Sequence, residues 1–235
     1  DVLLVSGERW WSFECANHEC CPPGGRELPD APSAFTAAAT VDGLVVLPDR
    51  AAVEALLEPL PDDVRAALIP ALAAAENAAV QQTVAGQGRR WEVSVKRELF
   101  RAARAADEIG WTGVPDEPAA RLAAGLAVTA VRDAVWLAID GGRLDGRPLW
   151  RDLARRAPVP YDAAALFLYG WASWRAGDGA LARIAADRAL ASDAGYTAAG
   201  LLQSAVVSGL DPRRLPRLRM PRQATPPGQA ARASG

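Results

Sequence analysis

The three cysteines of the chain and its single histidine lie close together near the start of the sequence. Cys15, His18, Cys20 and Cys21 all fall in the stretch "ECANHECC". Thiolate and imidazole groups are common ligands of zinc, and thiolates also carry out redox chemistry. Structural zinc sites usually combine two separated ligand pairs, and no second pair follows in this sequence. Because the adjacent Cys20 and Cys21 are expected to point in different directions, the spacing argues against a zinc site.

Three interpretations of this cysteine-rich loop remain open. The favoured one is that the cysteines act as small apolar side chains at the end of a β-hairpin, beside tryptophans. The second is local redox chemistry, with a disulfide between Cys15 and Cys20. The third is thiol- or metal-dependent sensing through the four residues of the loop, in which zinc would be the cofactor. Without that site, no cofactor is expected.

The sequence contains no recognisable catalytic motif. A hydrolase triad would have to use His18, and no partner motif accompanies it. There is no GxxxxGK[ST] phosphate loop, no GxGxxG after a strand and no HExxH pair. The acid pairs Asp62–Asp63 and Asp116–Glu117 lie where helices are expected to begin, and there they favour helix capping. No catalytic residue is therefore predicted, and the interpretation leans against an enzyme.

Two charged residues interrupt the most apolar helical stretch, "RLAAGLAVTAVRDAVWLAI". Arg132 and Asp133 would be costly in lipid, so we expect the centre of a soluble, cytoplasmic helical domain rather than a membrane span. Buried charges must be paired, which favours an ion-pair network over a ligand site. Arg132 and Asp133 nevertheless remain ligand or interaction candidates. Trp171 and Trp174 are candidates as well, although the spacing of the tryptophans suits core packing.

The charge of the chain is small but uneven. The net charge is −2; the part from Asp211 onward carries six arginines and one acid and is +5, which leaves −7 for the rest. The segment "DPRRLPRLRMPR" could contact an acidic partner or nucleic acid, but prolines interrupt it and no aromatic residues are interleaved. We interpret it as part of a solvated, disordered tail. An unknown protein partner is expected, whereas nucleic acid and membranes are not.

The first residues are typical of a β-hairpin that would position the cysteines. In "DVLLVSGERWWSFEC", a two-residue turn that starts at Gly7 places Val5 opposite Trp10 and carries the returning strand to Cys15. The run over residues 2–5 is apolar on both faces, as in a strand that is covered on both sides. A lone hairpin is marginal in water. We therefore expect the hairpin to be the edge of a truncated α/β sheet whose remainder lies upstream.

From Asp49 onward the pattern is helical almost throughout. Before that point, Ser33 is expected to cap a short alanine-rich helix that runs to about Val41. The later helices are expected over residues 50–58, 62–84, 90–109, 117–139, 148–157, 162–175, 179–192 and 197–208, with Gly and Pro between them. The sequence thus predicts an α+β fold that is predominantly α-helical. Its parts would be the hairpin with the Cys/Pro-rich turn over 1–48, a helical bundle over 49–212 and the Arg/Pro-rich tail over 213–235.

One pair of expected helices has a repeat-like pattern. The stretch "AALFLYGWASWRAGDGALARIAADRALASDAGY" is similar to a tetratricopeptide repeat, with Leu166, Tyr169 and Gly170 at the W, L and G places of that motif. It departs from the motif at Ala186, where phenylalanine is usual, and at Ala194, where proline is usual. Because no second complete repeat follows, we interpret the stretch as a packed helical pair whose groove would be an interaction surface.

Several signatures together resemble a known family. They are "GERWWSFEC" with "CCPPGG", "VLPDR", "AVRDAVWLAI", "LWRDLARRAP", "ALFLYGWASWRAGDGALARIAADRAL" and "YTAAGLLQSAVVSGLDP". In these stretches the chain resembles the actinobacterial domain of unknown function 4192. The resemblance implies an intracellular bacterial protein with an upstream α/β portion and a helical C-terminal portion, and it implies no activity.

The leading functional hypothesis is therefore a non-enzymatic protein-interaction or regulatory module. The first alternative is an enzyme or small-ligand-binding domain whose site lies between the N-terminal sheet and the helices, lined by Arg132, Asp133 and the cysteine loop. The second alternative is a sensor that uses the cysteines.

Overall fold

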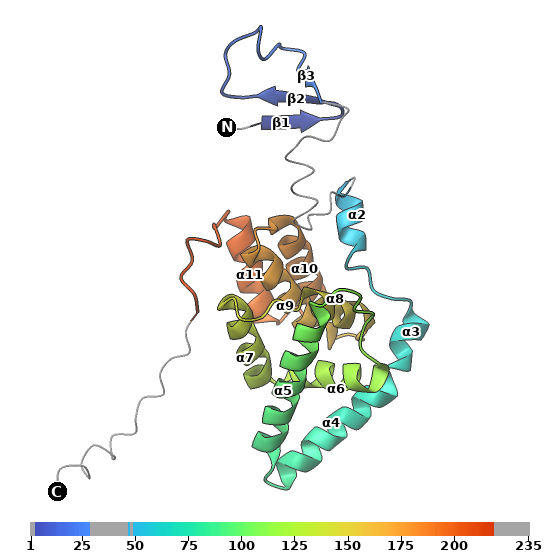
Figure 1. Cartoon of the computed structure of the whole chain (residues 1–235). Helices are drawn as coiled ribbons and strands as arrows, with labels where there is room; N and C mark the ends of the chain where they lie inside the picture. Colours follow the sequence, from blue (N-terminus) through green and yellow to red (C-terminus); the bar gives the residue numbers. More distant parts are fainter. Residues whose placement is uncertain (1–2, 29–46, 48, 219–235) are drawn as a thin grey trace, which may run out of the picture. The chain divides into compact units, whose positions relative to one another are not determined.

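The computed structural model describes residues 3–28, 47 and 49–218. The chain divides into two compact units, Asp1–Pro48 and Asp49–Gly235, and each is described by itself. The first contains a small antiparallel sheet and the second is helical, which confirms the predominantly helical α+β class (Figure 1). The helix expected over residues 33–41 and the part of the predicted tail over residues 219–235 lie outside the described residues.

The N-terminal unit is a three-stranded antiparallel sheet in the order β1-β2-β3. The strands are β1 (Leu3–Ser6), β2 (Arg9–Ser12) and β3 (Arg26–Glu27). The hairpin register is the predicted one, with Val5 opposite Trp10. It is set by the two-residue turn, in which Gly7 has a φ of +60°, a conformation that glycine adopts at little cost.

Two features of this sheet differ from the prediction. Strand β2 ends at Ser12 and does not reach Cys15, because the Ser12 Oγ accepts hydrogen bonds from the backbone N–H groups of Glu14 (3.3 Å) and Cys15 (3.2 Å) and thereby turns the chain. Strand β3 was not expected from the sequence; in it Arg26 pairs with Trp10. The chain thus supplies its own third strand after the cysteine loop.

The second unit is a bundle of helices joined by short loops. Its helices are α2 (Arg50–Ala55), α3 (Asp62–Ala67), α4 (Ile69–Val84), α5 (Gly88–Ala106), α6 (Asp116–Ala127), α7 (Thr129–Asp140), α8 (Arg147–Arg156), α9 (Asp162–Arg175), α10 (Gly179–Ser192) and α11 (Thr197–Val207). The bounds of α9 and α10 are the predicted ones. Local chemistry explains the start of α10, because the Asp178 side chain accepts the Leu181 N–H at 2.9 Å and caps the helix.

Helix α9 is the centre of the bundle. Every residue from Asp162 to Trp174 is buried, and α9 packs against α6, α7, α8, α10 and α11 (Figure 1). The small Gly170 permits this close approach, since a Cβ there would lie 2.9 Å from a methyl carbon of Leu202 and 3.0 Å from the Cβ of Ala185. The alanine-rich pattern is therefore a packing feature of a tightly spaced bundle.

Two predicted long helices are in fact broken. The helix expected over 62–84 is interrupted at Leu68, because Pro70 has no N–H to donate to the preceding turn. The helix expected over 117–139 bends by 95° between α6 and α7. Val128 is the residue at the bend, with an extended backbone (ψ 112°), and the β-branched pair Val128 and Thr129 weakens helix preference there. The two halves thereby bury separate apolar faces.

Within the described residues, no single helix is both long enough and apolar enough to cross a membrane. The bent pair α6 and α7 reaches the required length and composition only when its two halves are taken together. Most of its apolar side chains belong to the core of the bundle.

The segment after α11 packs against the bundle. Residues 213–218 were expected to belong to the disordered tail. In the structure, Leu215 is half-buried against the core, and the backbone N–H of Leu218 donates to Asp140 Oδ2 at 2.5 Å. These contacts fix the chain as far as the described residues extend.

Candidate functional site

The sulfur atoms of the three cysteines converge in the N-terminal unit. The Sγ atoms of Cys15, Cys20 and Cys21 all lie within 4.8 Å of one another, and none is in a disulfide. The expectation that the adjacent Cys20 and Cys21 diverge is therefore wrong. Their convergence follows from a tight turn, in which the backbone carbonyl of Asn17 accepts the Cys21 N–H at 2.7 Å. His18 is exposed and does not belong to this group.

The thiols influence each other's proton affinity. A hydrogen bond from the Asn17 backbone lowers the pKa of Cys15, and the Cys21 thiol acts in the same direction. The hydrogen bond to Cys15, together with desolvation, raises the pKa of Cys21 to about 11. Among these two thiols, Cys15 is therefore the one that ionises first, and its thiolate is stabilised within the cluster.

Arg132 and Asp133 pair with each other in the helical unit. The Nε of Arg132 donates to Asp133 Oδ1 at 2.8 Å, and its Nη1 donates to the hydroxyl of Tyr196 at 3.0 Å. Burial raises the pKa of Tyr196, so its hydroxyl stays protonated at neutral pH. Arg132 lines a cavity of about 420 Å³ together with Glu76, Tyr161 and Tyr196. Because its guanidinium is already engaged by Asp133 and Tyr196, Arg132 offers few free donors to a ligand.

Trp171 and Trp174 lie in the core, where only 4% and 3% of their surfaces are exposed. The indole N–H of Trp171 donates to Asp140 at 3.1 Å. Both rings also stack beneath the guanidinium of Arg175, whose central carbon lies 5.6 Å and 5.4 Å from the ring centres. Neither ring presents a free face, so these residues position a buried ion pair.

That ion pair, between Asp140 and Arg175, was missed in the sequence. Asp140 is completely buried, and its Oδ1 accepts a hydrogen bond from the Nε of Arg175 at 2.6 Å, while the Nη2 of Arg175 lies 2.5 Å from the same oxygen as an ion pair. The available signal was an acid at the end of the most apolar helical stretch, which needs a buried cation. Sequence spacing could not identify the cation, because it lies 35 residues away.

Helix α5 presents a basic face that was not predicted from the sequence. The helix carries six basic residues and two acids. Its buried side is formed by Trp91, Val95, Leu99, Ala103 and Ala106. The opposite side carries exposed arginines at positions 90, 97, 101 and 104, which recur with helical spacing. The sequence "RRWEVSVKRELFRAARAA" does contain a signal for this face. Apolar residues recur in it every three or four positions, and arginines stand between them.

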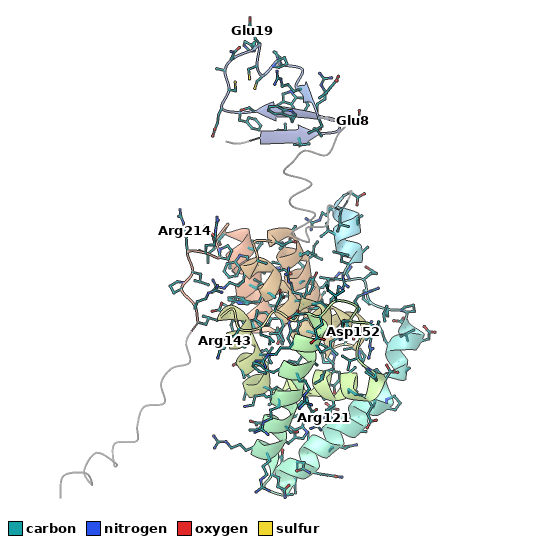
Figure 2. All side chains as sticks on the ribbon, viewed as in Figure 1. Glu8, Glu19, Arg121, Arg143, Asp152 and Arg214 are labelled. Carbon is teal, nitrogen blue, oxygen red and sulfur yellow. The ribbon has the colours of Figure 1, made fainter. Side chains whose placement is uncertain are left out.

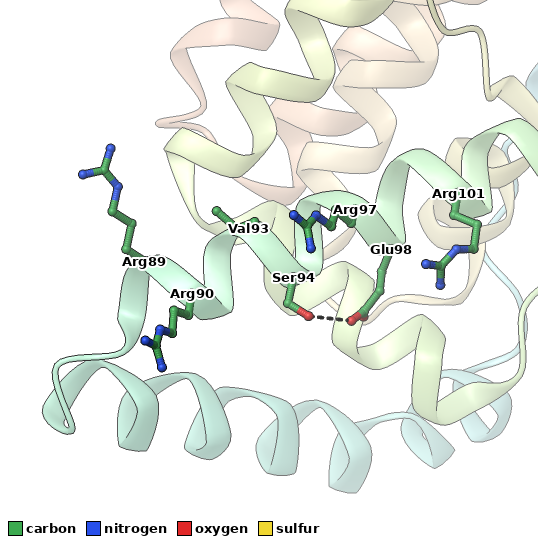
Figure 3. Close-up of a pocket in the computed structure, with 7 residues that line it drawn as sticks. All are labelled: Arg89, Arg90, Val93, Ser94, Arg97, Glu98 and Arg101. Atoms are coloured by element: carbon green, nitrogen blue, oxygen red, sulfur yellow. Dashed lines mark hydrogen bonds between the residues drawn. The ribbon is translucent and has the colours of Figure 1, made fainter.

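The arginines of this face have no internal partners. In the part of the chain that the structure describes, no acid, carbonyl or hydroxyl is bound by the side chains of Arg90, Arg97 or Arg101. The neighbouring acid Glu98 is already engaged, because its carboxylate accepts from Arg121 at 2.6 Å and from Ser94 at 3.0 Å. Figure 3 shows the side chains of Arg90, Arg97 and Arg101 leaving α5, and it draws the hydrogen bond between Ser94 and Glu98 on the same helix.

Two shallow grooves lie along this face of α5. One encloses about 560 Å³ and is lined by Arg90, Val93, Arg97 and Arg101, among others. The second encloses about 740 Å³ and continues past Arg97 to Arg104. Val93, with 39% of its surface exposed, adds an apolar contact between the arginines. We call the exposed row at positions 90, 93, 97, 101 and 104 the α5 face.

Comparison with known proteins places the chain in a family. The family model described as "Domain of unknown function (DUF4192)" matches residues 1–213, and the chain belongs to this family. Neither the curated proteins nor the solved structures contain a match to this chain.

Proposed function

We propose that this member of the DUF4192 family is a non-enzymatic protein-interaction module, and that the α5 face is its docking surface. The observation that carries the proposal is the row of exposed arginines without internal partners. A surface arginine normally gains little from being held near other cations, since like charges repel. Their gathering on one helix face is explained by a partner that supplies the missing anions.

The partner that fits this surface is an acidic protein segment with apolar residues among its acids. A helix rises about 1.5 Å per residue, so positions 90 to 104 span roughly 21 Å, the length of about four helical turns in a partner. Guanidinium groups bind carboxylates in a bidentate manner. The exposed Val93 and the half-buried Phe100 add apolar contact area between the arginines.

Nucleic acid fits this face less well. A phosphate backbone gains nothing from the apolar contacts that Val93 provides, and nucleic-acid binding surfaces carry their positive charge over a broad area. The chain as a whole is slightly acidic, with a net charge of −2. The positive charge of α5 is therefore a local feature, suited to a short acidic segment.

The proposal assigns the module to the cytoplasm. Free thiols as close together as those of Cys15, Cys20 and Cys21 persist where glutathione and thioredoxin keep cysteines reduced. A regulatory role follows from the same surface, since charged docking of this kind is weak and reversible.

The test is a binding measurement with defined probes. A fluorescein-labelled helical peptide with glutamates at three- and four-residue spacing and leucines beside them is titrated with the full chain, and a duplex oligonucleotide of equal charge is titrated in parallel. We expect the peptide to bind more tightly than the duplex, and its binding to weaken as salt screens the charges.

Variants locate the surface. In R97E/R101E, two attractions of about 0.2–1 kcal/mol each become repulsions, so the peptide should bind roughly tenfold more weakly. The matched control, R151E/R214E, changes the net charge equally at two exposed arginines outside α5, and Arg214 lies on the C-terminal segment (Figure 2). Equal losses in both variants, or tighter binding of the duplex, would overturn the proposal.

A further inference from the structure

The three thiols of the N-terminal unit are spaced for a metal ion. Zinc–sulfur bonds are about 2.3 Å long, and two sulfurs of a tetrahedral site are then roughly 3.8 Å apart. The Sγ atoms of Cys15, Cys20 and Cys21 lie within 4.8 Å of one another, so each pair needs to close by about 1 Å or less to reach that separation. Side-chain rotation supplies a movement of this size without moving the backbone.

The backbone holds the three cysteines in this arrangement. The Asn17 side chain accepts from the N–H groups of Glu19 at 2.9 Å and Cys20 at 3.4 Å, which closes the turn that returns the chain toward Cys15. Cys15 is itself held by the hydrogen bond of its N–H to Ser12.

The far end of the loop is fixed against the sheet. The indole N–H of Trp11 donates to the carbonyl of Pro23 at 3.0 Å, and a side chain at Gly25 would collide with the Trp11 ring at 2.4 Å. Gly25 also has a φ of +73°, which glycine tolerates. The cysteines therefore belong to a loop that is hydrogen-bonded at its start, at its turn and at its end.

We propose that the thiols of Cys15, Cys20 and Cys21 together bind one thiophilic metal ion, with Zn²⁺ as the reference ion. On binding, each thiol loses its proton to solvent and forms one sulfur–metal bond, so that up to three protons are released for each ion. This role is independent of the α5 face.

The fourth coordination position is open to an outside donor. The sulfur group does not include the exposed His18, and Cys20 is exposed as well, so a bound ion is reachable from solvent. Zinc sites with three protein ligands keep their fourth position for water or another molecule. The site is thus suited to exchange or sensing of a metal rather than to permanent cross-linking of the fold.

The experiment uses the full chain, reduced and then freed of reductant under anaerobic conditions. It is titrated with Co²⁺ alone, whose thiolate charge-transfer absorption in the near ultraviolet reports sulfur ligation, and then with Zn²⁺, which displaces it. We expect one Co²⁺ per chain, full displacement by Zn²⁺, and at least a tenfold loss of affinity in each of C15S, C20S and C21S.

Further variants separate metal binding from loss of structure. Asn17→Ala keeps all three thiols but removes the side-chain acceptor of the turn, and should weaken binding; Asn17→Asp restores an acceptor and should recover it. Glu19→Gln, an exposed change in the same turn, and His18→Ala should leave the affinity within twofold of the parent. Bound Zn²⁺ should also protect the three thiols of the parent chain from alkylation.

Three results would overturn the proposed metal site. These are sub-stoichiometric Co²⁺ binding by the fully reduced chain, affinity that is insensitive to all three serine variants, or formation of an intramolecular disulfide as the only reaction of the cluster. A large loss of metal affinity in His18→Ala would show that His18 is a ligand, and would contradict the proposal that the fourth coordination position is open.

Discussion

Removal of the Asp140 carboxylate tests the buried ion pair between Asp140 and Arg175. Both residues also bind the backbone of the segment that follows α11. In Asp140→Ala the Arg175 guanidinium remains buried and loses its only carboxylate partner among the described residues. Breaking a buried pair by removing one partner costs about 3–5 kcal/mol. Arg175 keeps the backbone carbonyls of Pro212 and Leu215 as acceptors, so we expect a cost near the lower limit, about 3 kcal/mol.

That cost is a large part of the free energy of unfolding of a typical domain, which is about 5–15 kcal/mol. Urea denaturation followed by tryptophan fluorescence measures it, and thermal unfolding should show a fall in Tm of about 6 to 12 °C. Asp140→Ala should also hasten tryptic cleavage after Arg213 and Arg217, because the Leu218 N–H loses its acceptor.

A double-mutant cycle shows whether the effect comes from the pair. Arg175→Met removes the cation, and the double variant should be less destabilised than the sum of the single variants, because neither then leaves a lone buried charge. Glu54→Ala is the matched control, since its exposed pair with Arg50 should be worth less than about 1 kcal/mol. A stabilising role for the buried pair is refuted if Asp140→Ala costs no more than Glu54→Ala, or if the effects of the two single substitutions simply add.

The remaining predictions concern pH and packing. Desolvation raises the pKa of Asp162 above its ordinary 3.8, against the opposing Ser192 hydroxyl and Arg65 guanidinium. Its protonated form is therefore favoured in the folded state, and its contribution to stability is present below pH 3.8 and is lost as pH rises through the folded pKa. The free energy of unfolding is measured for the parent chain and for Asp162→Asn at several pH values. The parent value minus the variant value should fall as pH rises, and an increase in this difference would contradict the prediction. Gly125→Ala should destabilise by about 1–3 kcal/mol in urea denaturation, because its Cβ would lie 2.5 Å from a methyl carbon of Val95. Gly200→Ala, with open space around its Cβ inside α11, should instead be neutral or stabilising by up to about 1 kcal/mol, and equal effects at the two glycines would contradict the packing argument.

Local chemistry made much of the fold predictable. The register of the hairpin follows from the turn at Gly7, and the bounds of α9 and α10 follow from glycine and the Asp178 cap between them. The breaks at Leu68 and Val128 were missed for different reasons. Pro70 was a readable signal for the first break, whereas the 95° bend at Val128 depends on which apolar face each half can bury, a tertiary effect.

The candidate sites were less predictable, because they depend on side chains brought together by folding. Sequence spacing marked the cysteines as poor zinc ligands, but the turn at Asn17 gathers their sulfurs. The tetratricopeptide likeness of the α9 and α10 pair remains a prediction; in the structure the residues of α9 are occupied with core packing. A motif in a buried helix carries information about packing, and a docking surface has to be sought on exposed faces.

The arginines of this chain show how an arginine that serves the fold differs from one that is available for docking. Arg132 and Arg175 are mostly buried, and each has a carboxylate, further acceptors and an aromatic ring around its guanidinium. A buried cation without such partners would be too costly to keep, so their environments are explained by folding alone. Arg97 and Arg101 are exposed and have no such partners among the described residues, and stability of the fold does not require them. If the proposed docking to an acidic segment is right, R97E/R101E should weaken binding strongly and change the free energy of unfolding hardly at all.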